Sequence, residues 1–305
     1  MIYSLIDCHA DTASVALDEN VGFFNNGLHV DMNKINVDYT QFFAAFIAPE
    51  YKDCALERTM SIIKKLKNEI AKNQGKIVFC KSYKDYCENS GKVRAFLSVE
   101  GLEAVDDINV LEDFYNEGVR MATLTWNYSN QLAGGVEDAK KGITSFGKNV
   151  IKKMNDLGII PDVSHLNDRS FWDVMEESKK TVIASHSNSR KICDNKRNLT
   201  DEQFLAIKNN GGVVGINLYP LFLSGRKEAK NSDIMKHIEH FLSLGGEDNI
   251  CMGCDFDGVE ILPEGINGIG DIYKLFDEMK RKGYNDDLIN KLSCTNMERI
   301  LQENL

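Results

Sequence analysis

Near its start the chain reads Leu5-Ile6-Asp7-Cys8-His9-Ala10-Asp11-Thr12, an apolar run that ends in an imidazole and a carboxylate. The run predicts a β-strand, and alternate residues of a strand project to the same side. If the extended backbone continues past Ile6, His9 and Asp11 can reach one cation from the end of a single strand. The same string would also fit a polar turn that caps a helix, so its meaning depends on whether the chain offers further ligands.

Short apolar or β-branched runs alternate with helical patterns along the whole chain. Strands are predicted at residues 3–7, 42–47, 93–99, 119–124, 159–163, 181–185, 212–217 and 249–253. Apolar residues recur at helical spacing between them, over residues 56–70, 146–157 and 234–242, and Thr200 with Gln203 predicts a further helix start. Eight such units predict an α/β fold, a single TIM-type (β/α)8 barrel. An open doubly wound sheet is the alternative.

Composition excludes several classes of protein. The 305 residues contain no linker-like segment, so residues 1–305 are expected to form one barrel domain. A net charge of -10 would repel a phosphate backbone, so no nucleic-acid partner is expected. We also expect no membrane partner and a cytoplasmic location, because we find neither a signal peptide nor a membrane-spanning run. A homodimer is a candidate assembly.

The eight cysteines are scattered, which in a reducing compartment predicts free thiols. Cys251 and Cys254 form the only Cys-x-x-Cys pair. Because this pair falls at a predicted strand, we expect buried, inert thiols rather than a redox or zinc-ribbon motif.

Barrel enzymes carry their chemistry at the carboxyl ends of the strands. The polar residues at the predicted strand ends are His9, Asp11, Glu100, Trp126, Asn127, His165, His186, Asp255 and Asp257. Three of the six histidines directly follow apolar strands, which chance placement would not produce. By the same comparison His29, in a loop, and His237 and His240, on a predicted helix, are expected to be structural, and Glu103 is expected to be a solvated loop charge.

Three imidazoles together with Asp11 and Glu100 form a mixed nitrogen and oxygen donor set, which suits zinc better than magnesium or calcium. Five ligands are too many for one open catalytic site. They fit two cations about 3.5 to 4 Å apart that share a carboxylate, with a metal-bound water as the nucleophile. Glu100 is the expected bridge, because Gly101 lets the backbone turn tightly beside it.

With these residues in this order, the sequence resembles a known family, the membrane (renal) dipeptidases, which are dinuclear zinc dipeptidases. The resemblance covers nearly the whole chain and rests on motifs at residues 7–11, 41–43, 98–101, 118–125, 162–165, 184–187, 196–199 and 254–258. It implies that residues 1–305 form a single metallohydrolase barrel domain, like that of other metallo-dependent hydrolases. It also implies two Zn²⁺ ions per chain, one held by His9, Asp11 and Glu100, the other by Glu100, His165 and His186.

The resemblance also implies roles that spacing cannot show. Arg197 would bind the substrate carboxylate, and Asp255 would be the catalytic acid/base. Tyr219 is expected to bind substrate as well. Better-known members carry a histidine where this chain has Trp126, so either Trp126 or Asn127 replaces it as a hydrogen-bond donor, or the metals alone stabilise the oxyanion, or Trp126 only shapes the pocket wall.

These observations predict a dipeptidase in which a metal-bridging hydroxide attacks the peptide bond of a dipeptide. The animal members of the family are disulfide-linked and anchored outside the cell, so bacterial-type cytoplasmic members are the closer comparison. One alternative is another metal-dependent amidohydrolase that acts on N-acyl amino acids, lactones or phosphoesters. Many such barrels carry His-x-His on the first strand and a modified lysine at the fourth, and this chain has neither. A binding protein that has lost its chemistry is the third reading.

Overall fold

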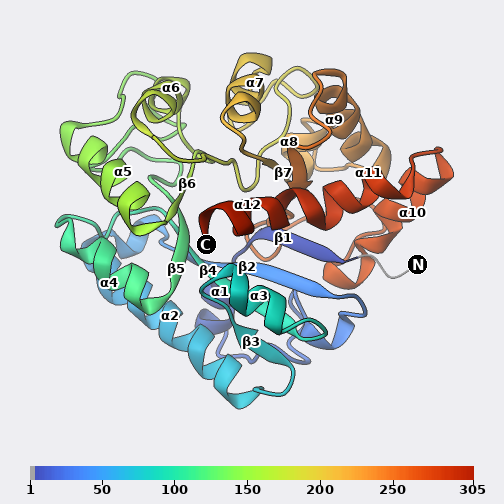
Figure 1. Ribbon diagram of the computed structural model, residues 1–305, viewed down its shortest axis with the longest axis horizontal. Coiled ribbons are helices and arrows are strands. Elements are labelled where there is room, and N and C mark those ends of the chain that lie inside the picture. The colour runs from blue at the N-terminus through green and yellow to red at the C-terminus, as the bar shows by residue number, and fades with distance from the viewer. Residues whose placement is uncertain (1–3) are drawn as a thin grey trace.

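The computed structural model describes residues 4–305 as strands surrounded by helices (Figure 1). The strands are β1 (Leu5–Ala10), β2 (Tyr39–Phe46), β3 (Ile77–Phe79), β4 (Val93–Glu100), β5 (Val119–Thr123), β6 (Ile160–Asp162), β7 (Val214–Ile216) and β8 (Ile250–Met252). The helices are α1 (Thr12–Asp18), α2 (Ala55–Lys72), α3 (Tyr83–Glu88), α4 (Asn109–Glu117), α5 (Ser145–Leu157), α6 (Asp168–Glu177), α7 (Asp201–Asn209), α8 (Pro220–Leu223), α9 (Asn231–Ser243), α10 (Tyr273–Arg281), α11 (Asp286–Asn290) and α12 (Asn296–Asn304).

The strands form one parallel sheet in the order β6-β5-β4-β2-β1-β8-β7. The predicted strand 181–185 is not a regular strand; it contributes two isolated parallel bridges, Ile183 to Asp162 of β6 and Ala184 to Val214 of β7. The predicted strand 3–7 begins outside the described residues and is seen as β1. The α/β class with a parallel sheet is therefore confirmed.

Strand β3 was not predicted. It pairs with the start of β4, where Ile77 lies opposite Val93, and β5 takes over the same edge of β4 from Leu97 onwards. Its three residues are too short to give a periodic signal.

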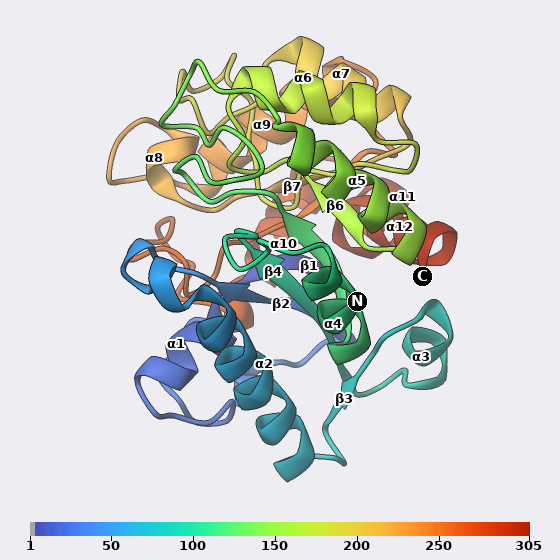
Figure 2. The ribbon, with the colours of Figure 1, turned by 90° about the vertical axis from the view of Figure 1, so that its left-hand side faces the viewer.

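Apolar side chains fill both faces of the sheet. An outer layer packs the strands against the surrounding helices. The inner layer brings together side chains from all around the sheet and from α12, namely Ile6, Cys8, Phe42, Phe96, Met121, Ile160, Ile183, Val213, Cys251, Met297, Ile300 and Leu301. Figures 1 and 2 show α12 beside the strands, near the C-terminus. Because this inner layer is packed, chemistry is restricted to the loops at the carboxyl ends of the strands.

The helix predictions hold, because local signals agree with the packing. Helices α2, α5 and α9 cover the three predicted amphipathic ranges, and Thr200 forms a capping box with Gln203 at the start of α7. All eight cysteines are free, as expected, and Cys251 and Cys254 are buried, as predicted for that pair. None of the helices in residues 4–305 has the length and apolar composition that crossing a bilayer requires.

Candidate active site

Glu100, the last residue of β4, lies at the centre of the predicted ligand set. Its Oε2 is 3.3 Å from Nε2 of His9, and its Oε1 is 2.7 Å from Nε2 of His165. Nε2 of His186 is 3.7 Å from the same Oε1. The two carboxylate oxygens therefore face different histidines, as a bridging ligand requires.

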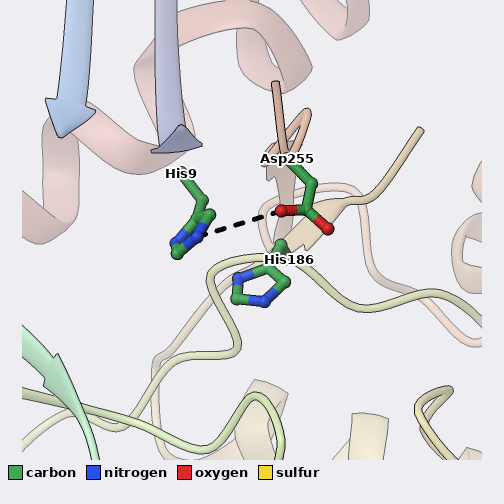
Figure 3. Close-up of side chains that lie close together, drawn as sticks. All are labelled: His9, His186 and Asp255. Atoms are coloured by element: carbon green, nitrogen blue, oxygen red, sulfur yellow. Dashed lines mark ion pairs between the residues drawn. The ribbon is translucent and has the colours of Figure 1, made fainter. Parts of the chain in front are cut away.

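Ligand atoms gather in three overlapping groups, each with its atoms within 4.8 Å of one another. The groups are His9 with Asp11 and Glu100, Glu100 with His165 and His186, and His9 with His186 and Asp255. Figure 3 shows the last group, in which Nε2 of His9 lies 3.9 Å from Oδ1 of Asp255. All five predicted metal ligands are buried and lie together.

The backbone turns sharply where the strands end. His165 and Asp255 have φ angles of 70° and 61°, a left-handed conformation that non-glycine residues seldom adopt, and Gly101 follows Glu100 with φ 87°. Such strained positions persist only where the surrounding structure holds them. These turns lie where Glu100, His165 and Asp255 enter the ligand groups.

Hydrogen bonds at Nδ1 fix the tautomers of His165 and His186. Nδ1 of His165 lies 2.8 Å from Oδ1 of Asn127, an acceptor, so Nδ1 carries the proton. Oγ of Ser185 donates its single proton to Asp162 and lies 2.7 Å from Nδ1 of His186, so it accepts a proton from that nitrogen. Both rings are thereby left with an Nε2 lone pair directed at the cluster, the usual arrangement around a metal.

The cluster fits a bound cation. Nε2 of His165 and Nε2 of His186 are 2.8 Å apart, and with both nitrogens unprotonated no proton joins them. Oδ1 of Asp11 is buried without a hydrogen-bond partner among the described residues, and Nε2 of His9 lies 3.3 Å from Oε2 of Glu100. Buried electron-rich atoms that face one another repel unless a positive charge lies between them.

Burial and neighbouring charges shift the pKa values of the side chains in the cluster. Burial, with Asp11 close by, raises the pKa of Glu100 to about 8. Burial also lowers the pKa values of His165 and His186 well below the ordinary range. For His9, burial acts to lower the pKa, but Glu100 and Asp11 outweigh it, and the pKa is raised well above its usual value.

The two aspartates that follow β8 have different environments. Asp255 lines the cavity beside His9, and burial raises its pKa. Asp257 accepts hydrogen bonds from the Thr12 hydroxyl and the His29 backbone N–H, both at 2.6 Å. Asp257 therefore joins the loop after β8 to Thr12 and His29. The His29 ring takes part as well, because its Nδ1 accepts a hydrogen bond from the Asp257 backbone N–H at 3.0 Å.

A cavity of about 400 Å³ opens onto the cluster, and Trp126, Asn127, Arg197 and Tyr219 all line it. Arg197 is buried, and burial lowers its pKa. Its Nη2 has no hydrogen-bond partner among the described residues, and the guanidinium lies 5.4 Å from the centre of the Phe222 ring. A buried cation with a free donor offers a binding point for an anionic group.

The model of the membrane dipeptidase family, peptidase family M19, matches residues 2–304. The chain belongs to this family. It is thus a hydrolase of the metallodipeptidase type, which confirms the resemblance read from its motifs.

Relatives of this membrane dipeptidase family member include an uncharacterized protein in the pqqA 5′ region of Klebsiella pneumoniae, 33% identical over 251 residues, which are 78% of this chain and 92% of that protein. An uncharacterized dipeptidase of Schizosaccharomyces pombe is 33% identical over 278 residues, which are 82% of this chain but only 66% of the yeast protein. A solved metallopeptidase of Rhodobacter sphaeroides, liganded with a phosphinate mimic of the dipeptide L-Ala-D-Ala, superposes with a TM-score of 0.93 at 25% identity and covers all of both chains.

Several site residues of this family member were not predicted from the sequence. Ser185 and Asp162 were seen only as parts of motifs, Asn217 only as the end of a predicted strand, and Phe46 only as an apolar strand residue. Glu103 was expected to be a solvated charge, which is wrong: burial raises its pKa to about 7, and it accepts a hydrogen bond from Asn130 Nδ2 at 3.2 Å. No local sequence pattern identifies these contacts. Most of the residues that make them are far apart in the chain, and serine, asparagine and phenylalanine are too common to mark a site by themselves.

Proposed function

We propose that this chain is a dinuclear zinc dipeptidase that hydrolyses the peptide bond of dipeptides. The observation that carries the proposal is the position of Glu100, whose two oxygens face His9 on one side and His165 on the other. One carboxylate so placed can hold two cations at once.

In this proposal His9, Asp11 and Glu100 hold one Zn²⁺, and Glu100, His165 and His186 hold the other. When bound, the two cations would supply Lewis acidity and lower the pKa of a water molecule for attack on the peptide carbonyl. Asn127 and Ser185 keep Nε2 of His165 and of His186 free of protons. The mixed nitrogen and oxygen donors favour zinc over magnesium or calcium.

The remaining cavity residues act on the substrate and its protons. Asp255 would accept the proton of the attacking water at its carboxylate and deliver it to the leaving amine. Arg197 would bind the free carboxylate of the dipeptide, which its buried, unpartnered Nη2 supports. Tyr219 and Trp126 would line the substrate, while Asn127, whose Oδ1 is engaged by His165, would position that ring rather than donate to the oxyanion.

We also propose that the sheet closes into a (β/α)8 barrel and that residues 1–305 form one domain. The isolated bridges of Ile183 and Ala184 support closure, because they join β6 and β7 through one intervening segment. The match of a single family model to residues 2–304 supports the single domain.

The test combines metal analysis with a dipeptide panel that covers L,L and L,D stereochemistry. The L,D members are included because the Rhodobacter sphaeroides metallopeptidase was solved with an L-Ala-D-Ala mimic. Zinc-loaded protein should hydrolyse dipeptides, and chelated protein should not. Turnover of N-acyl amino acids or lactones, without any dipeptide turnover, would instead support another metal-dependent amidohydrolase.

A further inference from the structure

Aromatic side chains form a wall of the cavity next to the ligand cluster. Phe46, Tyr51 and Trp126 line the same cavity as Glu100 and Arg197, and all three aromatics are partly exposed. The Phe46 and Trp126 rings lie 5.3 Å apart between centres, inclined at 56°. Partly exposed aromatic surface beside a reactive centre is typical of a binding subsite.

The aromatic wall is held rigidly from behind. The Phe46 backbone N–H donates to Oγ of Ser14 at 3.0 Å, and that hydroxyl donates to the Ala44 carbonyl at 3.2 Å. The Tyr51 ring packs under the Arg58 guanidinium at 4.3 Å. A preformed wall of this kind binds a side chain with little loss of conformational entropy.

The guanidinium of Arg58 is not available as a second anion site. It forms two hydrogen bonds with Asp18, at 2.6 and 2.7 Å, which balance its charge. Nε of Arg58 has no hydrogen-bond partner among the described residues, but both of its Nη atoms are engaged, whereas Nη2 of Arg197 has none. The cavity therefore has one cationic group that suits a carboxylate, Arg197, and three aromatic side chains, Phe46, Tyr51 and Trp126, that offer apolar surface.

Phe46 and Arg197 lie on opposite sides of the strand order. Phe46 is the last residue of β2, and Arg197 follows the bridging segment 182–184. In the closed order β1, β2, β4, β5, β6, segment 182–184, β7, β8, this segment is four positions from β2 in either direction. Glu100, His165 and Trp126 lie at strands between them, so a scissile carbonyl held at Glu100 and His165 has Trp126 beside it, with the Trp126 and His165 rings 6.1 Å apart.

We propose that Phe46, Tyr51 and Trp126 form the subsite for the side chain of the substrate's N-terminal residue, and that this subsite selects large apolar side chains. The inference rests on the proposed function, because Arg197 must hold the C-terminal carboxylate for the N-terminal residue to reach the aromatic wall. Each methylene that a hydrophobic pocket buries changes kcat/KM by roughly 10- to 200-fold. Leu-Ala should therefore be hydrolysed at least about 10-fold more efficiently than Ala-Ala.

The experiment measures kcat/KM for X-Ala dipeptides with alanine, leucine, phenylalanine, lysine or glutamate as X, and for the matched Ala-X series. Trp126→Ala should bring the Leu-Ala to Ala-Ala ratio close to one, and Trp126→Phe should restore most of it. Trp172→Ala is the matched control, because Trp172 is 44% exposed on α6 and is not part of the cavity lining. The ratio is insensitive to a general loss of activity, and a thermal unfolding curve for each variant identifies misfolding.

A Leu-Ala to Ala-Ala ratio near one in the wild type, or a ratio that Trp126→Ala leaves unchanged, would overturn the subsite while leaving the dipeptidase proposal intact. A preference for Lys-Ala that Glu50→Gln removes would also overturn it, because Glu50 lines the same cavity and would then select a cation. No hydrolysis of any dipeptide by zinc-loaded protein would refute the proposed function itself. If kcat/KM depends on X only in the Ala-X series, the aromatic wall binds the side chain of the C-terminal residue. That result would contradict its assignment to the N-terminal residue.

Discussion

Asn217 holds Asp255 in place: its Nδ2 donates a hydrogen bond to Oδ2 of the Asp255 carboxylate at 2.8 Å. Oδ1 of Asn217 accepts from the Tyr219 backbone N–H at 2.7 Å, and Asn188 pairs with the Asn217 backbone at 2.9 and 3.1 Å. The amide therefore orients one carboxylate oxygen of Asp255 and leaves the other, Oδ1, on the side of His9.

The substitution Asn217→Asp should keep the contact with Tyr219 and remove the one with Asp255. The new side chain still accepts from the Tyr219 N–H but places an acceptor, and a negative charge, against Asp255. Losing a hydrogen bond to a charged group, about 1.5 to 3 kcal/mol, should lower kcat roughly 10- to 100-fold with the metals retained. Steady-state kinetics alongside elemental analysis checks this, and wild-type kcat in the metal-loaded variant would show that Asp255 does not depend on Asn217.

Ser185→Ala should weaken metal binding at the His186 side. The hydroxyl accepts from Nδ1 of His186 and donates to Asp162, and removing such an outer partner lowers metal affinity by roughly 10- to 100-fold. Competition with a chelator measures the affinity without any assay of activity. Unchanged affinity of both cations would mean that the ring is held by its packing alone.

Asp255→Asn should retain both metals and lose most turnover, by the factor of about 10² to 10⁴ that a general acid/base contributes. The carboxylate is buried beside His9, and the amide that replaces it fits the same space but cannot accept a proton. If the variant stays active, another group carries the proton; Asp257 is a poor substitute, because the Thr12 hydroxyl and backbone N–H groups already engage it.

Arg197→Met should penalise a dipeptide far more than its C-terminal amide. The free acid loses a charge-assisted hydrogen bond of about 1.5 to 3 kcal/mol, which corresponds to roughly 10- to 100-fold in kcat/KM. The amide should change little, because it offers no carboxylate to the guanidinium. Equal losses for both substrates would indicate that Arg197 supports the loop rather than the substrate.

The cluster of candidate ligands could be predicted because its residues lie at the carboxyl ends of the strands or just beyond them. His9 lies near the end of β1, Glu100 ends β4 and His165 follows β6, and parallel strands bring such positions to one edge. Arg197 could not be assigned from spacing, since beside Lys196 it resembles a surface cation, and only the family motif pointed to it. Its burial depends on a loop whose course the sequence does not specify.

Contacts between distant segments account for the rest of what the sequence did not predict. Asn217 and Asp255 are 38 residues apart in sequence, and a strand-end asparagine has no local pattern that names its partner. Phe46 was placed in a predicted strand and given no role in the site, because most aromatic residues in strands pack in the core. The sixth predicted strand, residues 181–185, lies between β6 and β7 but forms only two isolated bridges, because an apolar run indicates where a segment is buried and not whether its backbone pairs regularly.

The metal content of Glu100→Gln beside the wild type tests the bridging role of Glu100 most directly. Glu103→Gln is the matched control, because Glu103 lies three residues further on and belongs to none of the three ligand groups. We expect two cations per chain in the fully loaded wild type and in Glu103→Gln, and loss from both sites in Glu100→Gln. A wild type that carries one cation when fully loaded, or a Glu100→Gln variant that keeps two with unchanged activity, would contradict that bridging role.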